Sequence, residues 1–388
     1  MNRINFLAVC AALAGCAVAH SSEPAAEIGL PEVQFALPNP AVVSRPPPAE
    51  ARAQLETCLA AGGGLIEVDR VNNNDTTAHG SVTAFASSPG GILGVASADG
   101  VVKFWTLEGM VSSASHSLFS YGPELPAAPG TDLAFDGDEL FLADVGGLVT
   151  KWYVDGRSRI VGGTSPGIAI VAVAVDHPRG RIAHAEDVVG GRIMLRGVGE
   201  DTTVLGPLET QAYEVSDLAF FDDGRLVIGG KNVAGAALLE VRDSADPARV
   251  VAAYAHAWAG FTEGPAVTLV SELAVRPGHV AVATNAYAVF LDEAMNVTAT
   301  SERLPLLSSR SIELTEHGLF AFVANVVDEH VEISVFDTAN AHQLQSVRAL
   351  AGDSSIVSLR TDDANDLLFA AYENGVIVAL SCAAAPQL

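Results

Sequence analysis

A unit of three short β-type runs, joined by two tight turns, recurs along most of this chain and limits the folds open to it. In the clearest copy, residues 79–105, the turns lie at residues 88–91 and 99–100, and the runs between them are rich in Val, Ala and Phe. Runs of this length and composition, bounded by Gly and Asp, predict strands joined by hairpin turns. No helix-type spacing of apolar residues competes with this pattern. The sequence therefore predicts an all-β domain.

Six further copies follow the first at intervals of about 39 to 54 residues, close to the period of propeller blades. They occupy residues 131–154, 170–195, 214–241, 269–291, 311–336 and 356–380. A single blade cannot bury both of its apolar faces, so the copies are expected to stack around a ring. We therefore predict a seven-bladed β-propeller. Six or eight blades are alternatives, because outer strands with degenerate sequences are hard to recognise.

The first copy also resembles a WD40 repeat. His79, Ser97, Asp99 and Trp105 match the positions of that family's histidine, serine, turn aspartate and tryptophan. In the family these four side chains form a hydrogen-bonded ladder that joins three strands, and a buried indole or imidazole N–H does need such a partner. In the second copy only Trp152 keeps its place. The resemblance, to the WD40/YVTN-like class, implies a fold and a structural tetrad but no catalytic chemistry.

The two ends of the domain indicate how the ring closes. The seventh copy has three visible strands, and an orphan apolar run, residues 65–71, precedes the first copy. Propellers commonly complete their last blade with an N-terminal strand, which removes exposed edges. We therefore expect residues 65–71 to pair with the last strand.

Two of the four cysteines flank these two strands, Cys58 before the orphan run and Cys382 at the end of the last one. The start of one antiparallel strand lies beside the end of its neighbour. This placement predicts a Cys58–Cys382 disulfide. The alternative is a pair of unrelated free thiols.

The first 20 residues resemble an export signal. Their apolar run, residues 6–14, is too short to span a bilayer and follows Met-Asn-Arg. Residues 13–16, Leu-Ala-Gly-Cys, resemble the bacterial lipobox, which implies removal of a signal peptide (1–15) and lipidation of Cys16. Ala17-Val18-Ala19 offers an alternative cut for ordinary secretion. Both readings predict an exported protein, and Ala17 after the cysteine implies, by the same resemblance, the outer membrane.

The chain then divides into three parts by composition. Residues 16–49 are rich in proline and predict an extended tether. Residues 50–63 predict a short helix that ends at a run of three glycines. Residues 64–388 form the predicted WD40-like propeller.

The charge balance disfavours nucleic acid as a partner. The chain has a formal net charge of −25, and it lacks the basic stripe that a phosphate backbone requires. An acidic surface with few lysines is typical of a soluble protein. We expect a monomer.

No enzyme motif is visible, since the ten histidines are scattered and the chain has no P-loop or Gly-x-Ser-x-Gly sequence. Residues 72–75, Asn-Asn-Asn-Asp, are rich in oxygen ligands but lack calcium-loop spacing, so a turn is the simpler interpretation. The sequence therefore assigns no catalytic residue and no metal ligand. Propeller enzymes assemble sites at the central mouth from several blades, which spacing cannot reveal. A lactonase or other hydrolase with a metal in the central channel, calcium for example, is thus the alternative function.

Aromatic loops are the candidate binding surface. Tyr121, His256, Trp258 and Phe261 lie in segments expected to connect one blade to the next. Aromatic side chains on loops over a rigid scaffold are common interface anchors. The alternative is that Trp258 and Phe261 fold back and cap their own blade. By analogy of fold, we expect an outer-membrane lipoprotein, facing the periplasm or the surface, that serves as a protein-binding platform in the cell envelope.

Overall fold

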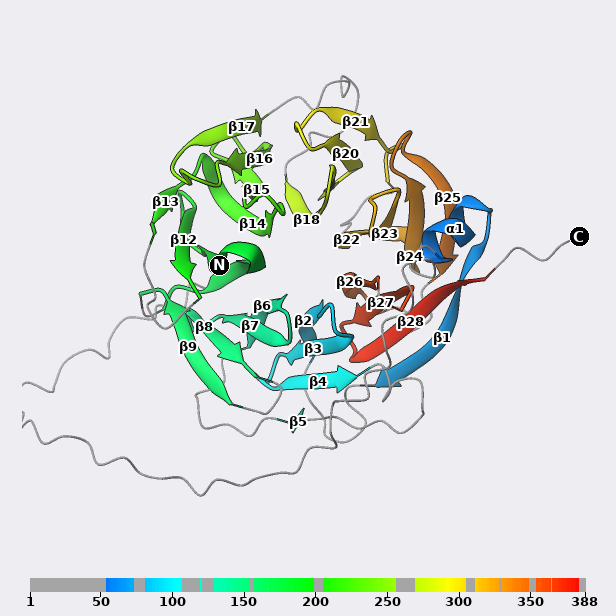
Figure 1. The fold of residues 1–388 in the computed structure, drawn as a ribbon, viewed down its shortest axis with the longest axis horizontal. Coiled ribbons are helices and arrows are strands. Elements are labelled where there is room, and N and C mark those ends of the chain that lie inside the picture. The colour runs from blue at the N-terminus through cyan, green and yellow to red at the C-terminus, as the bar shows by residue number, and fades with distance from the viewer. Residues whose placement is uncertain are drawn as a thin grey trace, which may run out of the picture. The chain divides into compact units, whose positions relative to one another are not determined.

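The computed structural model describes twelve segments of the chain, all within one compact unit, Pro47–Leu388. These segments are residues 54–72, 81–106, 119–120, 129–153, 157–165, 167–198, 205–255, 269–304, 311–327, 330–348, 354–363 and 365–383. Seven antiparallel four-stranded sheets stand in a ring around a common axis (Figure 1). The fold is a seven-bladed β-propeller, as predicted.

Each blade is a meander whose first strand lies innermost, because the first strands of successive blades contact one another around the ring. The first four blades, in order from the inner to the outer strand, are β2 (Val82–Ser87), β3 (Ile92–Ser97), β4 (Val102–Thr106) and β5 (Phe119–Ser120); β6 (Gly130–Asp136), β7 (Glu139–Asp144), β8 (Leu148–Trp152) and β9 (Ser158–Gly163); β10 (Ile170–Asp176), β11 (Arg181–Glu186), β12 (Arg192–Gly197) and β13 (Leu208–Glu209); and β14 (Ala212–Phe220), β15 (Leu226–Asn232), β16 (Ala237–Arg242) and β17 (Val250–Ala255). The sequence predicts the loop around Trp258 from about residue 254 to residue 267. β17 extends to Ala255, so the first two residues of that loop belong to the strand.

The last three blades follow the same order. They are β18 (Val270–Arg276), β19 (His279–Thr284), β20 (Ala288–Asp292) and β21 (Val297–Thr300); β22 (Ser311–Leu314), β23 (Phe320–Val327), β24 (His330–Asp337) and β25 (His342–Arg348); and β26 (Ile356–Asp362), β27 (Leu367–Tyr372), β28 (Val376–Ala383) and β1 (Gly64–Asn72).

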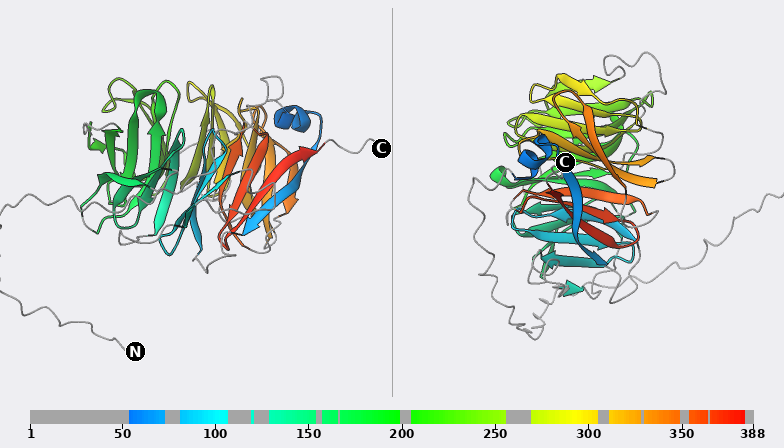
Figure 2. Two further views of the ribbon diagram at one scale, coloured as in Figure 1. Left: turned by 60° about the horizontal axis from the view of Figure 1, so that its bottom comes forward. Right: turned by 90° about the vertical axis from the view of Figure 1, so that its right-hand side faces the viewer.

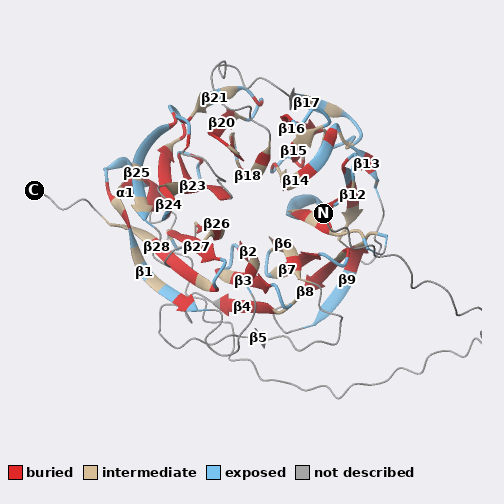
Figure 3. Ribbon diagram, turned by 180° about the vertical axis from the view of Figure 1, so that it is seen from behind, coloured by how far each residue is buried: buried red, intermediate tan, exposed pale blue. Residues whose placement is uncertain are grey.

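The core consists of apolar layers between neighbouring blades. The second strand of a blade is covered on both faces, so β11 and β27 are buried along their whole length (Figure 3). This explains why the second strands read as almost continuous apolar runs. Glycine is required at Gly147, in the turn between β7 and β8. Its φ is +86°, and a Cβ atom there would lie 2.2 Å from the Thr164 hydroxyl.

The N-terminal strand closes the ring, as predicted. β1 pairs antiparallel with β28 as the outermost strand of the last blade, from Gly64 opposite Ala383 to Asn72 opposite Val376 (Figure 1). Cys58 and Cys382 form a disulfide with their Cα atoms 6.0 Å apart, which confirms the predicted bridge.

A short helix, α1 (Gln54–Ala60), precedes β1 and contacts β28 at the edge of the ring (Figure 2). Leu55 and Leu59 are buried in the apolar cluster between the last two blades. The Glu56 carboxylate accepts hydrogen bonds from the backbone N–H of His317, at 3.1 Å, and from its ring Nδ1, at 2.8 Å. No helix in the described segments is both long and apolar enough to cross a bilayer.

Candidate functional site

The inner strands carry a β-bulge at a repeated position near their N-terminal ends. In six blades the pairing register shifts by one residue there. The residue after the bulge is polar in four of these blades and alanine in two: Asp132, Asp217, Glu272 and Ser358, against Ala84 and Ala172. Bulges redirect side chains, and here they place four polar side chains at equivalent positions of four inner strands.

Two of these carboxylates join consecutive blades. Asp132 accepts a hydrogen bond from the backbone N–H of Val173 in the next blade, at 2.8 Å. Asp217 does the same with Leu273 of the next blade, at 2.6 Å. The second oxygen of each carboxylate accepts from the N–H of the residue that follows it. Both side chains therefore seal a junction between blades.

Hydroxyl groups make equivalent joints elsewhere in the ring. The Ser311 hydroxyl accepts from the N–H of Leu359 at 2.7 Å, and Thr131 donates to the carbonyl of Ile170 at 2.5 Å. The Ser358 hydroxyl donates to the Phe85 carbonyl at 3.3 Å, across the closure between the last blade and the first. Inner strands have no backbone ladder to their neighbours in the next blade, so these side chains supply the hydrogen bonds.

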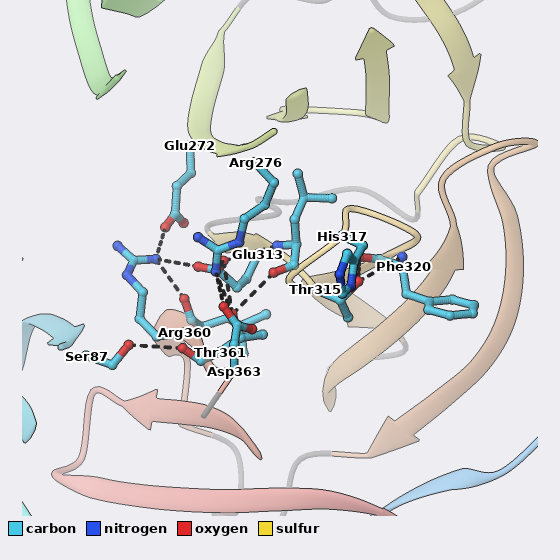
Figure 4. A network of polar contacts seen from close by, with 12 residues as sticks. Ser87, Glu272, Arg276, Glu313, Thr315, His317, Phe320, Arg360, Thr361 and Asp363 are labelled. Carbon is cyan, nitrogen blue, oxygen red and sulfur yellow. Dashed lines mark hydrogen bonds and ion pairs between the residues drawn. The ribbon is translucent and has the colours of Figure 1, made fainter. Parts of the chain in front are cut away.

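A charged network occupies the axis between blades five, six and seven (Figure 4). Arg360 donates from Nη1 to Glu272 at 2.8 Å and forms an ion pair with Glu313 at 3.7 Å. Arg276 donates from Nη2 to Glu313 at 3.0 Å and lies 3.5 Å from the Asp363 carboxylate. Two guanidinium groups thus bridge carboxylates from three separate blades.

The carboxyl groups around the axis hold protons more tightly than ordinary ones. Burial raises the pKa of Asp132 to about 6, against the effect of its backbone hydrogen bond to Val173 and of Arg360. Burial likewise raises the pKa of Glu272 to about 7, although Arg360 opposes the shift. Desolvation penalises the charged form of a buried acid. These groups therefore change protonation near neutral pH.

The pKa of Asp217 is raised by burial first and then by its acidic neighbours. Burial, and then the charges of Glu272 and Asp132, raise the pKa of Asp217 well above its usual range. Burial also raises the pKa of Glu313 while Arg276 and Arg360 oppose it. Burial lowers the pKa of Arg360, but the charges of Glu272 and Glu313 raise it by more than burial lowers it. The pKa therefore lies above its usual range, and the guanidinium stays charged.

Solvent reaches part of this network. The Arg360 side chain is 25% exposed, whereas that of Glu313 is 9% exposed. Glu272 and Glu313 are thus more enclosed than Arg360, whereas the Asp363 side chain, at 32% exposed, lies at the solvent side of the network. Chemically, the cluster can store protons and exchange them with solvent. Within the described ranges, no three His, Cys, Asp or Glu side chains are placed to hold a metal ion.

Three members of the predicted WD40-type tetrad are described. Ser97 is fully buried at the end of β3, and Trp105 is buried on β4. Asp99 lies in the turn between them, where its carboxylate accepts from the N–H of Val101 at 3.1 Å. His79 lies outside the described residues, so the complete tetrad stays a prediction.

The other predicted site residues fall outside the described segments. This applies to the lipidation site Cys16 and to the candidate binding loops at Tyr121, His256, Trp258 and Phe261. Of the oxygen-rich run at 72–75, only Asn72 is described, as the last residue of β1.

The axial cluster was not predicted, although the sequence contains a signal for it. Residues 131–134, 216–219 and 271–274 repeat one pattern, a hydroxyl residue, an acid, leucine and alanine. In the structure the hydroxyl residue lies at the register shift, the acid after it is the axial carboxylate, and the leucine after the acid is buried. The positions lie far apart in the chain, so only the ring brings them together.

A second feature lies at the turns between the second and third strands of blades two, three and four. Val145, Val189 and Val233 occupy these turns and are 45%, 78% and 84% exposed. Every blade has the same up-and-down order, so these turns all lie on one face of the ring. The structure therefore presents three exposed valines on that face, one in each of three successive blades.

Comparison with known proteins adds no relative. No protein-family model matches the chain, and no curated protein matches it.

Proposed function

We propose that this chain is an exported lipoprotein of the cell envelope whose propeller serves as a protein-binding platform. In this proposal residues 1–15 are a signal peptide, Cys16 carries the lipid in the outer membrane, and residues 16–49 are the tether. The finer membership in the WD40/YVTN-like class belongs to the same proposal. The Cys58–Cys382 disulfide supports export, because such bonds persist in oxidising compartments.

The observation that carries the platform role is the row of exposed valines at Val145, Val189 and Val233. Loops and turns over a rigid scaffold are the usual place for recognition. The three valines repeat at the same turn of successive blades, so one partner lying across this face can contact all three. Trp258 and Phe261 lie outside the described residues, and their part in this surface remains a proposal from the sequence alone.

Site-specific crosslinking tests the platform. A photo-reactive phenylalanine is placed at Val189 or Val233 in the full-length protein, in its native membranes, and adducts are identified by mass spectrometry. The matched control is Leu344, which is 43% exposed but lies on the outer strand β25. We expect one reproducible protein adduct from positions 189 and 233 and none from 344. Absence of an adduct at all positions, or the same adducts at all of them, contradicts the proposal.

The lipid anchor has its own test. Replacing Cys16 with Ser removes the acceptor of the lipid, so radiolabelled palmitate should be lost and the protein should leave the membrane fraction. If the wild-type protein takes up no label and its mature N-terminus follows Ala19, the ordinary secretion site is correct instead.

The second candidate is a propeller hydrolase or lactonase that acts at the axis. It is favoured by the solvent-reached network in which Glu272 and Glu313 have raised pKa values, a feature of many active sites. Turnover of an ester or lactone panel, lost in both Glu272→Gln and Glu313→Gln, would support it. No turnover by the wild-type protein, with or without calcium, would leave the carboxylates with their structural role.

A further inference from the structure

A histidine without a hydrogen-bond partner is buried between blades two and three. His184 lies in the middle of β11, and its residue is 0% exposed. Both ring nitrogens are buried, and neither forms a hydrogen bond with any described residue. Buried polar groups in native proteins are almost always paired, so an imidazole in this position needs a physical account.

The ring stands close against the outer half of blade two. A Cβ atom at Gly162 of β9 would lie 3.3 Å from the His184 Cε1, the ring carbon between the two nitrogens, and 3.4 Å from the Cβ of Val149 on β8. Side chains two apart on a strand share a face, so Ile182 points the same way as His184. Ile182 and Val149 belong to the apolar layer between these two blades. The imidazole is therefore enclosed by apolar groups and by the backbone of β9.

A neighbouring cation disfavours a proton on this ring. Arg196 of β12 donates from Nη2 to the carbonyl of Gly163 at 3.3 Å, so its guanidinium reaches the same strand, β9, that His184 faces. The Arg196 Nε is itself buried without a hydrogen-bond partner among the described residues. A protonated imidazole would add a second positive charge beside this guanidinium. Its two N–H groups would also lack acceptors.

The acids on the surrounding strands do not compensate such a charge. Within the described segments, the charged and titratable groups on the strands around His184 are engaged elsewhere or exposed: Glu186 of β11 with Arg192 of β12, Asp176 of β10 with Arg181 of β11, Lys151 of β8 with Glu139 of β7, Asp144 of β7 with the N–H of Leu148, Asp132 of β6 with the N–H of Val173, Asp136 of β6 with His177, Glu214 of β14 with Lys231 of β15, Asp217 of β14 with the N–H groups of Leu218 and Leu273, and the exposed Arg159 of β9, Glu209 of β13 and Tyr213 of β14.

We propose that His184 makes the junction between blades two and three labile to acid, because its ring takes up a proton only when the two blades part. In the closed junction the imidazole is neutral and packs as an apolar side chain. Once the blades separate, water hydrates the ring and accepts hydrogen bonds from both N–H groups of the charged form. Acid therefore favours the open junction, and neutral pH favours the closed ring.

Proton linkage gives the direction and the window of this effect. Burial, and then the charge of Arg196, lower the pKa of His184 from its ordinary value of 6.5 to about 4. Between these values the unfolded chain binds a proton at this ring and the folded chain does not, so falling pH favours unfolding. The contribution of His184 to stability is present above pH 6.5 and is lost as the pH falls toward 4. From pH 7 to pH 5 it lowers the folding equilibrium constant by about twentyfold.

The test compares denaturant unfolding of the wild type and of His184→Leu at pH 7 and pH 5, in the full-length protein with its disulfide intact. Leucine fills the site without a titrating group. We expect the folding equilibrium constant of the wild type, relative to that of His184→Leu, to fall about twentyfold between the two pH values. Other groups that titrate in this window act in both proteins and cancel from the ratio. An unchanged ratio would overturn the proposal.

His342→Gln is the matched control. It removes a histidine that is exposed at the start of β25, in blade six, so its pH dependence should follow that of the wild type. If His342→Gln changes the pH dependence as much as His184→Leu does, the effect belongs to histidines in general and the buried junction is not its source.

Hydrogen exchange of the wild type keeps the proposal falsifiable if His184→Leu does not fold. After correction for the intrinsic effect of pH, peptides from β8, β9 and β11 should lose protection between pH 7 and pH 5. Peptides from β22 and β23, in blade six, should lose much less. Equal loss around the ring, or full protection of β11 at pH 5, contradicts the proposal.

Discussion

At the scale of single residues, Trp105 contributes to the junction between the first and last blades, which its position in the sequence does not reveal. Trp105 packs between the first and last blades, in the cluster that contains Phe85 and Phe369. The two phenylalanine rings meet edge to face with centroids 6.4 Å apart. Trp105 therefore supports the closure of the ring as well as its own blade.

Trp105→Ala should lower the free energy of unfolding by about 3–5 kcal/mol, the usual range for truncating a large buried aromatic. Denaturant unfolding followed by circular dichroism measures it. Val233→Ala, at a site 84% exposed, is the control and should stay within about 0.5 kcal/mol of the wild type. A wild-type curve for Trp105→Ala would mean that this junction carries little of the stability.

Gly63 is required by the disulfide. A Cβ atom at this position would lie 2.4 Å from the Cys58 Sγ and 2.8 Å from the Cys382 Sγ. Gly63→Ala should therefore slow or prevent the bridge and leave thiols that react with an alkylating agent without reduction, seen by intact mass. Gly62→Ala is the control: its φ is +80°, but nothing lies within 4 Å of its Cβ, so strain alone should not expose thiols.

At the scale of elements, β1 and α1 act as one clasp on the last blade. β1 pairs along its length with β28, Leu55 and Leu59 of α1 are buried in the cluster between the last two blades, and the disulfide joins the last turn of α1 to Cys382 near the end of β28. An edge strand held only by hydrogen bonds would fray and expose a pairing surface. The bridge opposes this by fixing the junction between α1 and β1.

Replacing both Cys58 and Cys382 with Ser should destabilise the propeller, because the bridge closes a loop with a sequence separation of 324. Loop-closure entropy alone gives about 5 kcal/mol for a loop of this length. Thermal unfolding of the double variant is compared with that of the wild type. If the two midpoints coincide, the packing of α1 and β1 is sufficient without the bond.

The elements also show how far sequence reasoning reaches. The first three strands of each blade were predicted from apolar runs between Gly, Asp and Asn turns, because those strands are buried. The outer strands of the first six blades were not, since they are short or largely exposed: β13 has two residues, and β25 is mostly exposed. The outer strand of the last blade, β1, was predicted because its apolar run stands alone before the first copy. A half-solvated strand needs no apolar pattern, so it leaves little signal in the sequence.

At the scale of the whole molecule, the net negative charge of the chain opposes the closure of the seven blades into a ring. The chain carries a net charge of −25, and several carboxyls meet at the axis of the ring. Self-repulsion from a net charge of this size destabilises a compact state. Apolar layers between blades and the inner-strand joints offset that repulsion.

Salt should therefore stabilise the propeller. Raising ionic strength from about 0.01 M to 0.15 M shortens the screening length from about 30 Å to 8 Å, so the melting temperature should rise by several degrees. Scanning calorimetry at pH 7.5 measures the shift, and sedimentation in the same buffers checks that the protein stays a monomer. A melting temperature that falls on adding salt would mean that attractive ion pairs, such as Arg360 with Glu272, outweigh the net repulsion.

The sequence by itself determined the seven-bladed ring, its closure by the N-terminal strand and the Cys58–Cys382 bridge. These follow from local patterns: strand runs, turn residues and the antiparallel geometry that brings two cysteines together. Only the tertiary structure decided the axial network of Asp132, Asp217, Glu272 and Arg360. Four different blades supply one of these residues each, and their electrostatic coupling exists only at the common axis, where burial and proximity act on groups that no local pattern connects.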